Sequence, residues 1–232
     1  MLNSEIIYII KEQTDKHHVS DNTGFSDEQI LYYLLATRAK LLHDKNKNGR
    51  PISTTNQMST PCINLIPAVN CPCVIPDDCI PLMTERIIPN SIGELISVSN
   101  PYDNVEYVKT KSNLAKYRSK NRFDYFNDST SYFENDERTG KRIFIITKKP
   151  LKAIRTTFIP ENPEEVYRMD DCNGHNEYEC VSSYDLPWKL DPDLTKICID
   201  ETINILLRSR VQITDNRNDN TDSNVNNKQE IY

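Results

Sequence analysis

The sequence predicts an α+β fold, in which N-terminal helices and a C-terminal helix pack on a central antiparallel β-region with long loops. Two observations predict this class. Apolar residues recur at helical spacing near both ends of the chain, whereas the middle holds short apolar runs separated by turn-forming residues. All 13 prolines lie between Pro51 and Pro192, and proline favours extended segments and turns over helix interiors.

Two helices are predicted near the N-terminus, over about residues 4–13 and 27–43. In both segments apolar side chains recur at the spacing of a helix face. The second helix has the clearer start, because Ser26 at the N-cap and Gln29 in the first turn form a capping box. Gly49, with a proline shortly after it, predicts where this helix stops.

A β-rich region is predicted over residues 52–165. Six runs bounded by proline, asparagine or aspartate are the expected strands: Cys62 to Ile66, Met83 to Ile88, Glu94 to Val98, Val105 to Lys109, Arg142 to Thr147 and Lys152 to Ile159. The last two runs flank residues 148–150, which predict a turn between neighbouring strands. The aromatic and polar stretch 121–140 is expected to form either a long hairpin arm or a partner-binding loop.

The last predicted helix covers residues 192–210, with Asp191 as its N-cap and Pro192 in its first turn. It is apolar around much of its circumference, so we expect it to be buried on two sides, in the core or against another subunit. Residues 1–210 are therefore expected to form a single α+β domain. The Asn/Asp-rich tail 211–232 cannot offset its own ordering entropy, so we expect only partners to order it.

The charge balance argues against a dedicated nucleic-acid-binding protein. Lys and Arg number 28 against 34 Asp and Glu, so the formal net charge is −6, whereas phosphate binding is usually driven by an excess of basic residues. Two local basic stretches remain, at Lys109–Arg122 and Lys141–Lys152. They support an alternative function, a DNA-binding or packaging accessory protein that uses basic loops.

No run of 18 apolar residues is present, so no transmembrane helix is expected. The short apolar run at the N-terminus lacks a basic flank and a small-residue cleavage site, so no signal peptide is expected either. The 7 cysteines are accordingly expected to be reduced thiols, in a reducing cytoplasm or in a particle assembled there.

The cysteines also raise the question of a metal site. The candidate ligands are Cys62, Cys71, Cys73, Cys79, Cys172, His175 and Cys180. Zinc sites usually contain C-x2-C or C-x4-C pairs, whereas this sequence offers C-P-C and no second pair. Zinc is therefore the less favoured interpretation, and no metal is expected.

Catalytic chemistry finds no support in the sequence. A nucleophilic serine or cysteine needs a base, and the available histidines are His17, His18, His43 and His175. They lie in polar or helical segments typical of solvated side chains, and the adjacent acids Asp170 and Asp171 lie in a polar loop. Walker A, G-x-G-x-x-G, G-x-S-x-G and H-E-x-x-H motifs are absent. We expect no enzyme activity, no catalytic residue and no cofactor.

The order of several segments resembles a known family. The segments are Phe25 to Leu42, Cys62 to Ala68, the cysteine-containing stretch 71–79, Ile88 to Ile92, Phe158 to Val166 and Leu186 to Leu190 ahead of the last helix. In this order they resemble the tail-connector or ring proteins of crAss-like and related Bacteroidetes phages. The resemblance covers about residues 1–210 and leaves out the tail.

The resemblance implies a virion structural protein in the neck between portal and tail, assembled in the host cytoplasm. It implies self-association into a ring of about twelve copies, whose contacts close by rotation. Such a ring would extend the DNA channel and dock tail components. Its partners would be the portal, neighbouring tail proteins and genomic DNA that passes without specific binding.

Overall fold

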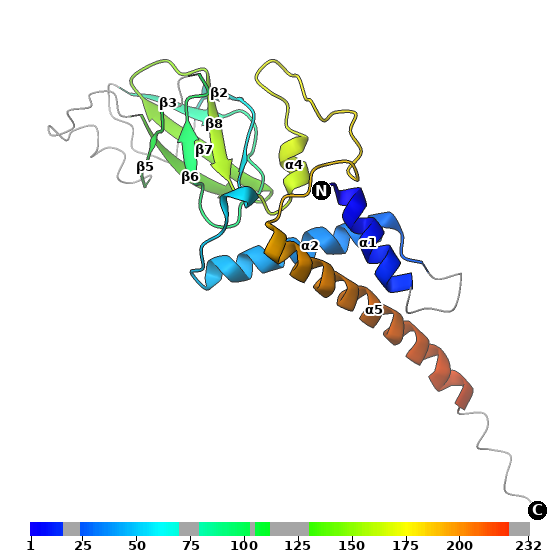
Figure 1. The fold of residues 1–232 in the computed structure, drawn as a ribbon. Coiled ribbons are helices and arrows are strands. Elements are labelled where there is room, and N and C mark those ends of the chain that lie inside the picture. The colour runs from blue at the N-terminus through cyan, green and yellow to red at the C-terminus, as the bar shows by residue number, and fades with distance from the viewer. Residues whose placement is uncertain (16–23, 70–78, 103–104, 112–129, 223–232) are drawn as a thin grey trace, which may run out of the picture. The chain divides into compact units, whose positions relative to one another are not determined.

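In the computed structural model the chain forms helices near its ends and a curled mixed sheet in the middle (Figure 1). The residues described are 1–15, 24–69, 79–102, 105–111 and 130–222, with side chains through residue 209. Contacts divide the chain into two compact units, Met1–Leu41 with Ser182–Tyr232, and Leu42–Val181. We name them the helical unit and the barrel unit. The α+β class predicted from the sequence is confirmed.

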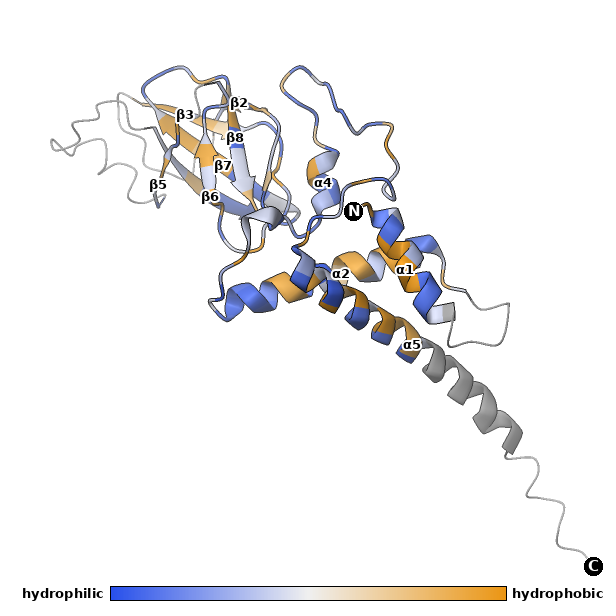
Figure 2. Cartoon of the chain, in the orientation of Figure 1, coloured by the Kyte–Doolittle hydropathy of each residue, from blue (hydrophilic) through white to orange (hydrophobic). Residues whose placement is uncertain are grey.

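The helical unit contains α1 (Asn3–Asp15), most of α2 (Asp27–Lys47) and α5 (Pro192–Asp222). Its core consists of aliphatic side chains from all three helices, and Figure 2 shows hydrophobic residues along each of them. Ile6, Leu34 and Leu206 are fully buried. Each such side chain contributes roughly 1.5–3 kcal/mol by leaving water, so burial holds these helices together.

Both predicted N-caps form. Gln29 N donates to Ser26 Oγ at 3.2 Å and Ser26 N donates to Gln29 Oε1 at 3.3 Å, which completes the capping box of α2. In α5, Leu194 N donates to Asp191 Oδ1 at 3.1 Å. These starts were predictable because all the donors and acceptors lie within one helical turn.

The helix ends lie further along the chain than predicted. The helix α2 runs to Lys47, where Gly49 adopts φ 64° and Arg50 N donates to Lys45 O at 3.0 Å. The helix α5 continues to Asp222 instead of ending at 210. The predicted ends were placed where the apolar periodicity stops. Backbone hydrogen bonds can continue a helix beyond that point, because they do not require an apolar face. Among the described residues, no helix is both long and apolar enough to cross a membrane.

The barrel unit is built on eight strands. They are β1 (Met58–Ser59), β2 (Ile63–Pro67), β3 (Ile80–Thr84), β4 (Ser97–Ser99), β5 (Val108–Lys109), β6 (Ser131–Glu137), β7 (Gly140–Thr147) and β8 (Ala153–Phe158). Their order is β1-β8-β2-β3-β7-β6-β5, with β4 also on β8. All pairs are antiparallel except β5 with β6, which is parallel.

The sheet closes on itself. Just before β5, Tyr107 N donates to Val98 O at 2.8 Å, and after β4 Asn100 N donates to Val105 O at 3.0 Å. These bonds join the β5 end of the sheet to β4, which pairs with β8 at the other end. Closure covers the edges of the sheet at β4 and β5 and fixes the outward direction of alternate side chains.

The strand β7 is the centre of this unit. Ile143 and Ile145 point to one face and Phe144 and Ile146 to the other, and all four are buried. Burial on both faces explains why this strand is a continuous apolar run instead of an alternating one. The Phe144 ring stacks on Phe133 of β6 with centroids 5.1 Å apart.

One strand-pairing prediction is wrong. Residues 148–150 connect β7 to β8, but these strands are not neighbours, because β2 and β3 lie between them. The strand β2 makes this arrangement possible, since Ile63 pairs with Ile154 of β8 and Leu65 pairs with Thr84 of β3. Of the stretch 121–140, residues 131–140 belong to β6 and its hairpin with β7, and residues 121–129 lie outside the described residues.

Candidate functional site

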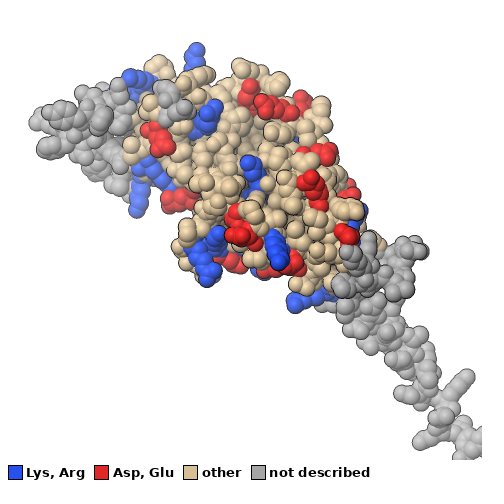
Figure 3. All heavy atoms as spheres, viewed as in Figure 1, with Lys and Arg blue, Asp and Glu red and all other residues tan. Residues whose placement is uncertain are grey.

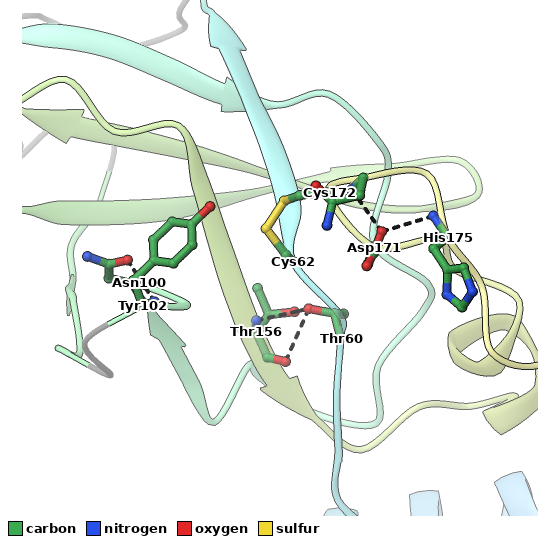
Figure 4. The surroundings of a disulfide bond; sticks show 9 residues. Thr60, Cys62, Asn100, Tyr102, Thr156, Asp171, Cys172 and His175 are labelled. Carbon is green, nitrogen blue, oxygen red and sulfur yellow. Dashed lines mark hydrogen bonds between the residues drawn. A yellow bond between two sulfur atoms is a disulfide. The ribbon is translucent and has the colours of Figure 1, made fainter.

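A disulfide ties a long loop to the barrel. Cys62, just before β2, bonds to Cys172, with Cα atoms 5.1 Å apart (Figure 4). We call residues 168–181, the loop that carries Cys172, the strap. The expectation of reduced thiols is wrong for this pair. The sequence separation of 110 residues hides the short Cα distance that makes the bond feasible.

The strap also has hydrogen bonds of its own. Asp171 Oδ1 accepts from the backbone N–H groups of Asn173 at 2.8 Å and His175 at 2.9 Å. These two donors hold the pKa of the Asp171 carboxyl below its ordinary value. The Arg168 guanidinium donates to Tyr178 O at 3.2 Å. The strap therefore has a defined shape although it contains no helix or strand.

Ahead of the strap stands the short helix α4 (Pro163–Tyr167). Its N-cap is Asn162, whose Oδ1 accepts from Glu164 N at 3.1 Å, and Pro163 occupies the first helical position. Val166 and Tyr167 are buried. The Tyr167 ring contacts Tyr178 of the strap, with centroids 4.8 Å apart.

A cavity of about 400 Å³ lies between the strap, α4 and the outer face of the sheet. We call it the barrel pocket. The apolar residues that line it include Met58, Val166, Tyr167 and Met169, and the polar ones include Arg155 of β8 and His175 of the strap. All of these residues belong to the barrel unit.

A charged cluster lies where the barrel closes. Lys109 Nζ of β5 lies 2.6 Å from Glu134 Oε1 of β6 and 2.9 Å from Glu94 Oε2. Lys141 Nζ of β7 lies 3.0 Å from Glu134 Oε2 and donates to Gly93 O at 3.2 Å. The cluster thus links β5, β6 and β7 to the segment before β4. Two side chains from the predicted basic stretches are therefore neutralised within the chain.

The cluster should make stability depend on pH in two ranges. The hydrogen bond from Lys109 and its charge lower the pKa of Glu94. Burial alone would lower the pKa of Lys109, but hydrogen bonds to Glu134 and Glu94 outweigh burial and raise it. A lowered carboxyl pKa contributes stability above the ordinary value of 4.5, and that stability is lost on acidification. The raised pKa of Lys109 contributes stability that is fully present below the ordinary value of 10.5. That stability is lost as the pH rises above 10.5.

We expect the loss of stability in each pH range to be on the order of 0.5 kcal/mol, because Glu94 is mostly exposed to solvent. Urea unfolding from about pH 3 to pH 11 measures this loss. The Lys109→Gln variant should show a weaker dependence of stability on pH in both ranges. The matched control is Lys148→Gln, which removes an exposed lysine outside the cluster. Equal pH profiles for the two variants would contradict this account.

Comparison with known proteins decides the family. A model of the family described as phage tail ring protein 2 matches residues 5–228, nearly the whole chain. The chain belongs to this family. No curated protein matches it. The resemblance to ring proteins of crAss-like phages is confirmed, and this ring protein is a structural component of the phage tail and of the virion.

The described acids and histidines that were considered as catalytic candidates take part in separate structural contacts in this ring protein. Asp170 pairs with Arg86 at 2.7 Å, whereas Asp171 caps its own turn. His43 Nε2 lies 2.8 Å from Glu161 Oε1, and His175 lies in the strap. His17 and His18 lie outside the described residues.

The cysteines of the ring protein take different roles. Cys71 and Cys73 lie outside the described residues. Within the described residues, no group of three or more His, Cys, Asp or Glu side chains is placed to hold a metal ion. Cys79, Cys180 and Cys198 are not disulfide-bonded. Burial raises the pKa of the Cys198 thiol to about 12, so this thiol stays protonated at neutral pH.

Two surfaces of the ring protein merit attention as contact sites. On α5, Cys198, Thr202 and Leu206 are fully buried, whereas Ile197 and Ile205 remain exposed. The barrel pocket is the second surface, and no sequence signal predicted it. Its walls come from residues far apart in the chain, and the strand register and the Cys62–Cys172 disulfide bring them together.

Proposed function

We propose that this ring protein is a non-enzymatic subunit of a ring in the neck between portal and tail. The ring extends the DNA channel and docks tail components, and about twelve copies close it by rotation. The observation that carries this proposal is the family match over residues 5–228. Placement in the neck, the copy number and the portal as a partner are part of the proposal.

The charge distribution supports passage of DNA without tight binding. The net charge is −6, and in Figure 3 basic and acidic side chains are interspersed on the visible face. Lys109 and Lys141 are held in ion pairs with Glu134. Lysines held in ion pairs are less available to neutralise DNA phosphates, so fewer counterions are released from the DNA. The salt-dependent attraction between the protein and DNA is therefore weaker. A DNA-binding accessory role is the alternative, and measurable duplex binding at low salt would favour it.

The exposed residues of α5 provide a test of assembly. Ile197→Glu with Ile205→Glu should leave the free energy of unfolding within about 0.5 kcal/mol, because both side chains are exposed. The same variant should reduce ring formation at least tenfold, because a buried charge in a subunit contact is strongly unfavourable. The measurement is particle mass in solution, alone and with purified portal.

The matched control adds the same charge elsewhere on α5. Lys196→Gln with Asn204→Glu also changes the charge by two units at exposed positions, and it should assemble normally. A chain that joins no oligomer, alone or with portal, would count against a ring subunit. A particle map that places the chain outside the neck would contradict the proposed location.

We further propose that residues 1–210 fold as one domain and that partners order the Asn/Asp-rich tail 211–232. A single unfolding transition for the full chain, unchanged when residues 214–232 are removed, is the expected result, and the shortened chain should assemble less well. Two separate calorimetric transitions would contradict it.

A further inference from the structure

A second cavity lies in the helical unit, between α1 and α5. Its volume is about 600 Å³, and we call it the α1–α5 pocket. Residues of α1, of the segment before α5 and of the first turns of α5 line it, and all of them belong to the helical unit. The apolar residues that line it include Ile9, Trp188, Leu190 and Ile199, and the polar ones include Gln13 and Asp200.

The α1–α5 pocket is held in shape by hydrogen bonds within the chain. Trp188 Nε1 donates to Thr195 Oγ1 at 3.0 Å, which fixes the indole ring against α5. Trp188 N donates to Met1 O at 3.0 Å. A site that is already formed loses little entropy when a segment enters it. An apolar cavity that also contains polar side chains suits an aromatic group with a polar end, such as a tyrosine.

The helix α2 has a second apolar face, which the fold leaves uncovered. Tyr32 is 68% exposed, Ala36 is exposed and Ala39 is half-buried. Successive residues of a helix are rotated by about 100°, so these three lie on the side of α2 opposite buried Leu34. We call them the outer face of α2. A helix that is apolar on both sides is usually covered on both sides, so the outer face indicates a docking surface.

The outer face of α2 and the α1–α5 pocket lie on different sides of the helical unit. The side of α5 toward α2 is marked by Cys198, whose Sγ donates to Leu34 O at 3.6 Å, and by Glu201, which pairs with Lys40 at 3.4 Å. The α5 residues that line the pocket lie on average about 160° further round the helix axis. None of the α2 residues, all of which are described, lines the pocket.

The outer face of α2 continues onto the exposed part of α5. Glu201, the partner of Lys40, lies halfway between exposed Ile197 and Ile205. These two isoleucines therefore border the same surface. A contact on this surface explains why charges at both positions should impair ring formation.

The two surfaces complement each other in shape, polarity and charge. One presents a tyrosine on an apolar helix face, and the other is an apolar cavity with polar side chains. Exposed Glu28 lies one turn before Tyr32, and exposed Lys196 lines the pocket. An exposed ion pair contributes little affinity but orients a contact.

We propose that the α1–α5 pocket of one subunit receives Tyr32 and the outer face of α2 from a second copy. The Tyr32 ring fills the apolar part of the pocket, and the small side chains of Ala36 and Ala39 let the helix backbone approach its rim. This inference rests on the proposed ring, whose subunits need two different complementary surfaces. In a ring of many copies these surfaces lie on nearly opposite sides, because each contact turns the chain by only a small angle.

Variants of the full chain test both surfaces. Tyr32→Ala removes the anchor and Asp200→Trp fills the pocket, and each should reduce ring formation at least tenfold, because buried aromatic anchors dominate the affinity of such contacts. Gln13→Trp fills the pocket from α1 and replaces Asp200→Trp if that variant does not fold. The measurement is particle mass in solution, alone and with purified portal, on variants whose urea midpoints match wild type.

Two matched controls change the same residue types elsewhere. Tyr8→Ala removes a tyrosine of equal exposure, 68%, from α1. Asn204→Trp places a tryptophan at an exposed position of α5 outside the pocket. Both controls should assemble as wild type does, and a loss of assembly in Tyr8→Ala equal to that in Tyr32→Ala would overturn the inference.

A mixture of the two damaged variants tests the head-to-tail geometry. Tyr32→Ala keeps an intact pocket and Asp200→Trp keeps an intact outer face, so one copy of each can make one contact but no ring. Neither variant alone should dimerise, whereas the mixture should contain dimers and nothing larger. If wild type associates without portal but the mixture contains no dimer, the inference is wrong.

Failure of this contact can be told apart from failure of the ring. If wild type forms rings, alone or on the portal, and Tyr32→Ala forms them equally well, the contact is wrong while the proposed function stands. If wild type joins no oligomer with or without portal, the proposed function fails and the contact fails with it.

Discussion

Replacing Gly140 with alanine should destabilise the barrel unit by about 4 kcal/mol. An added Cβ would lie 2.1 Å from Ile88 O and 2.7 Å from Ile87 Cγ2, and Gly140 has φ 155°. The carbonyl of Ile88 cannot move freely, because it accepts from Lys141 N at 2.8 Å while Ile88 N donates to Lys141 O at 2.8 Å. Relief of the clash breaks two backbone hydrogen bonds, each worth about 1 kcal/mol, and adds strain of about 1–3 kcal/mol.

Gly174→Ala is the matched control for that substitution. Gly174 has φ 76°, but nothing lies within 4 Å of an added Cβ. Alanine at position 174 would therefore lose stability only because it must adopt the left-handed backbone conformation, which costs roughly 1–2 kcal/mol. Urea unfolding of the two variants separates the close approach from the backbone effect. An equal loss of unfolding free energy in the two variants would show that the close approach of Gly140 to Ile88 contributes nothing to the effect.

The features that the sequence predicted well are local ones. The caps at Ser26 and Asp191 are set by groups within four residues of each other, so their hydrogen bonds can be read from spacing. The apolar run in β7 is equally local, because four consecutive buried residues indicate a strand covered on both faces. Fold class follows from such segments, since helices at the ends and strands in the middle are consistent with few architectures.

What the sequence did not predict is non-local. The strand β6 was not among the six predicted strands, because its apolar residues stop at Phe133 and charged residues follow. A hairpin arm was one of the two expectations for residues 121–140, and β6 forms a hairpin with β7 in the described part of that stretch. The predicted pairing of β7 with β8 was wrong because β2 and β3 lie between these strands, and no local sequence signal shows that arrangement. Arg155 reads in the sequence as an outward polar residue of a strand. Only the register opposite Ser99 and the position of the strap place it in a pocket.

Cysteine pairing is also non-local and could not be predicted from the sequence. The disulfide between Cys62 and Cys172 is expected to have the second large effect on stability. Cys62→Ser with Cys172→Ser should lower the free energy of unfolding by about 4 kcal/mol. Cross-linking across 110 residues restricts the unfolded chain, and loops of this order correspond to roughly 4–5 kcal/mol before native strain is subtracted. Cys180→Ser, which removes an exposed free thiol, should change stability little.

Reductant distinguishes a covalent effect from a packing effect. Dithiothreitol should expose two additional thiols in wild type and lower its stability to that of the double serine variant, which should itself be unaffected. Loss of the bond should also raise hydrogen exchange in the strap, because Cys172 is its covalent link to the sheet. A wild-type stability that is insensitive to reductant would contradict the bond.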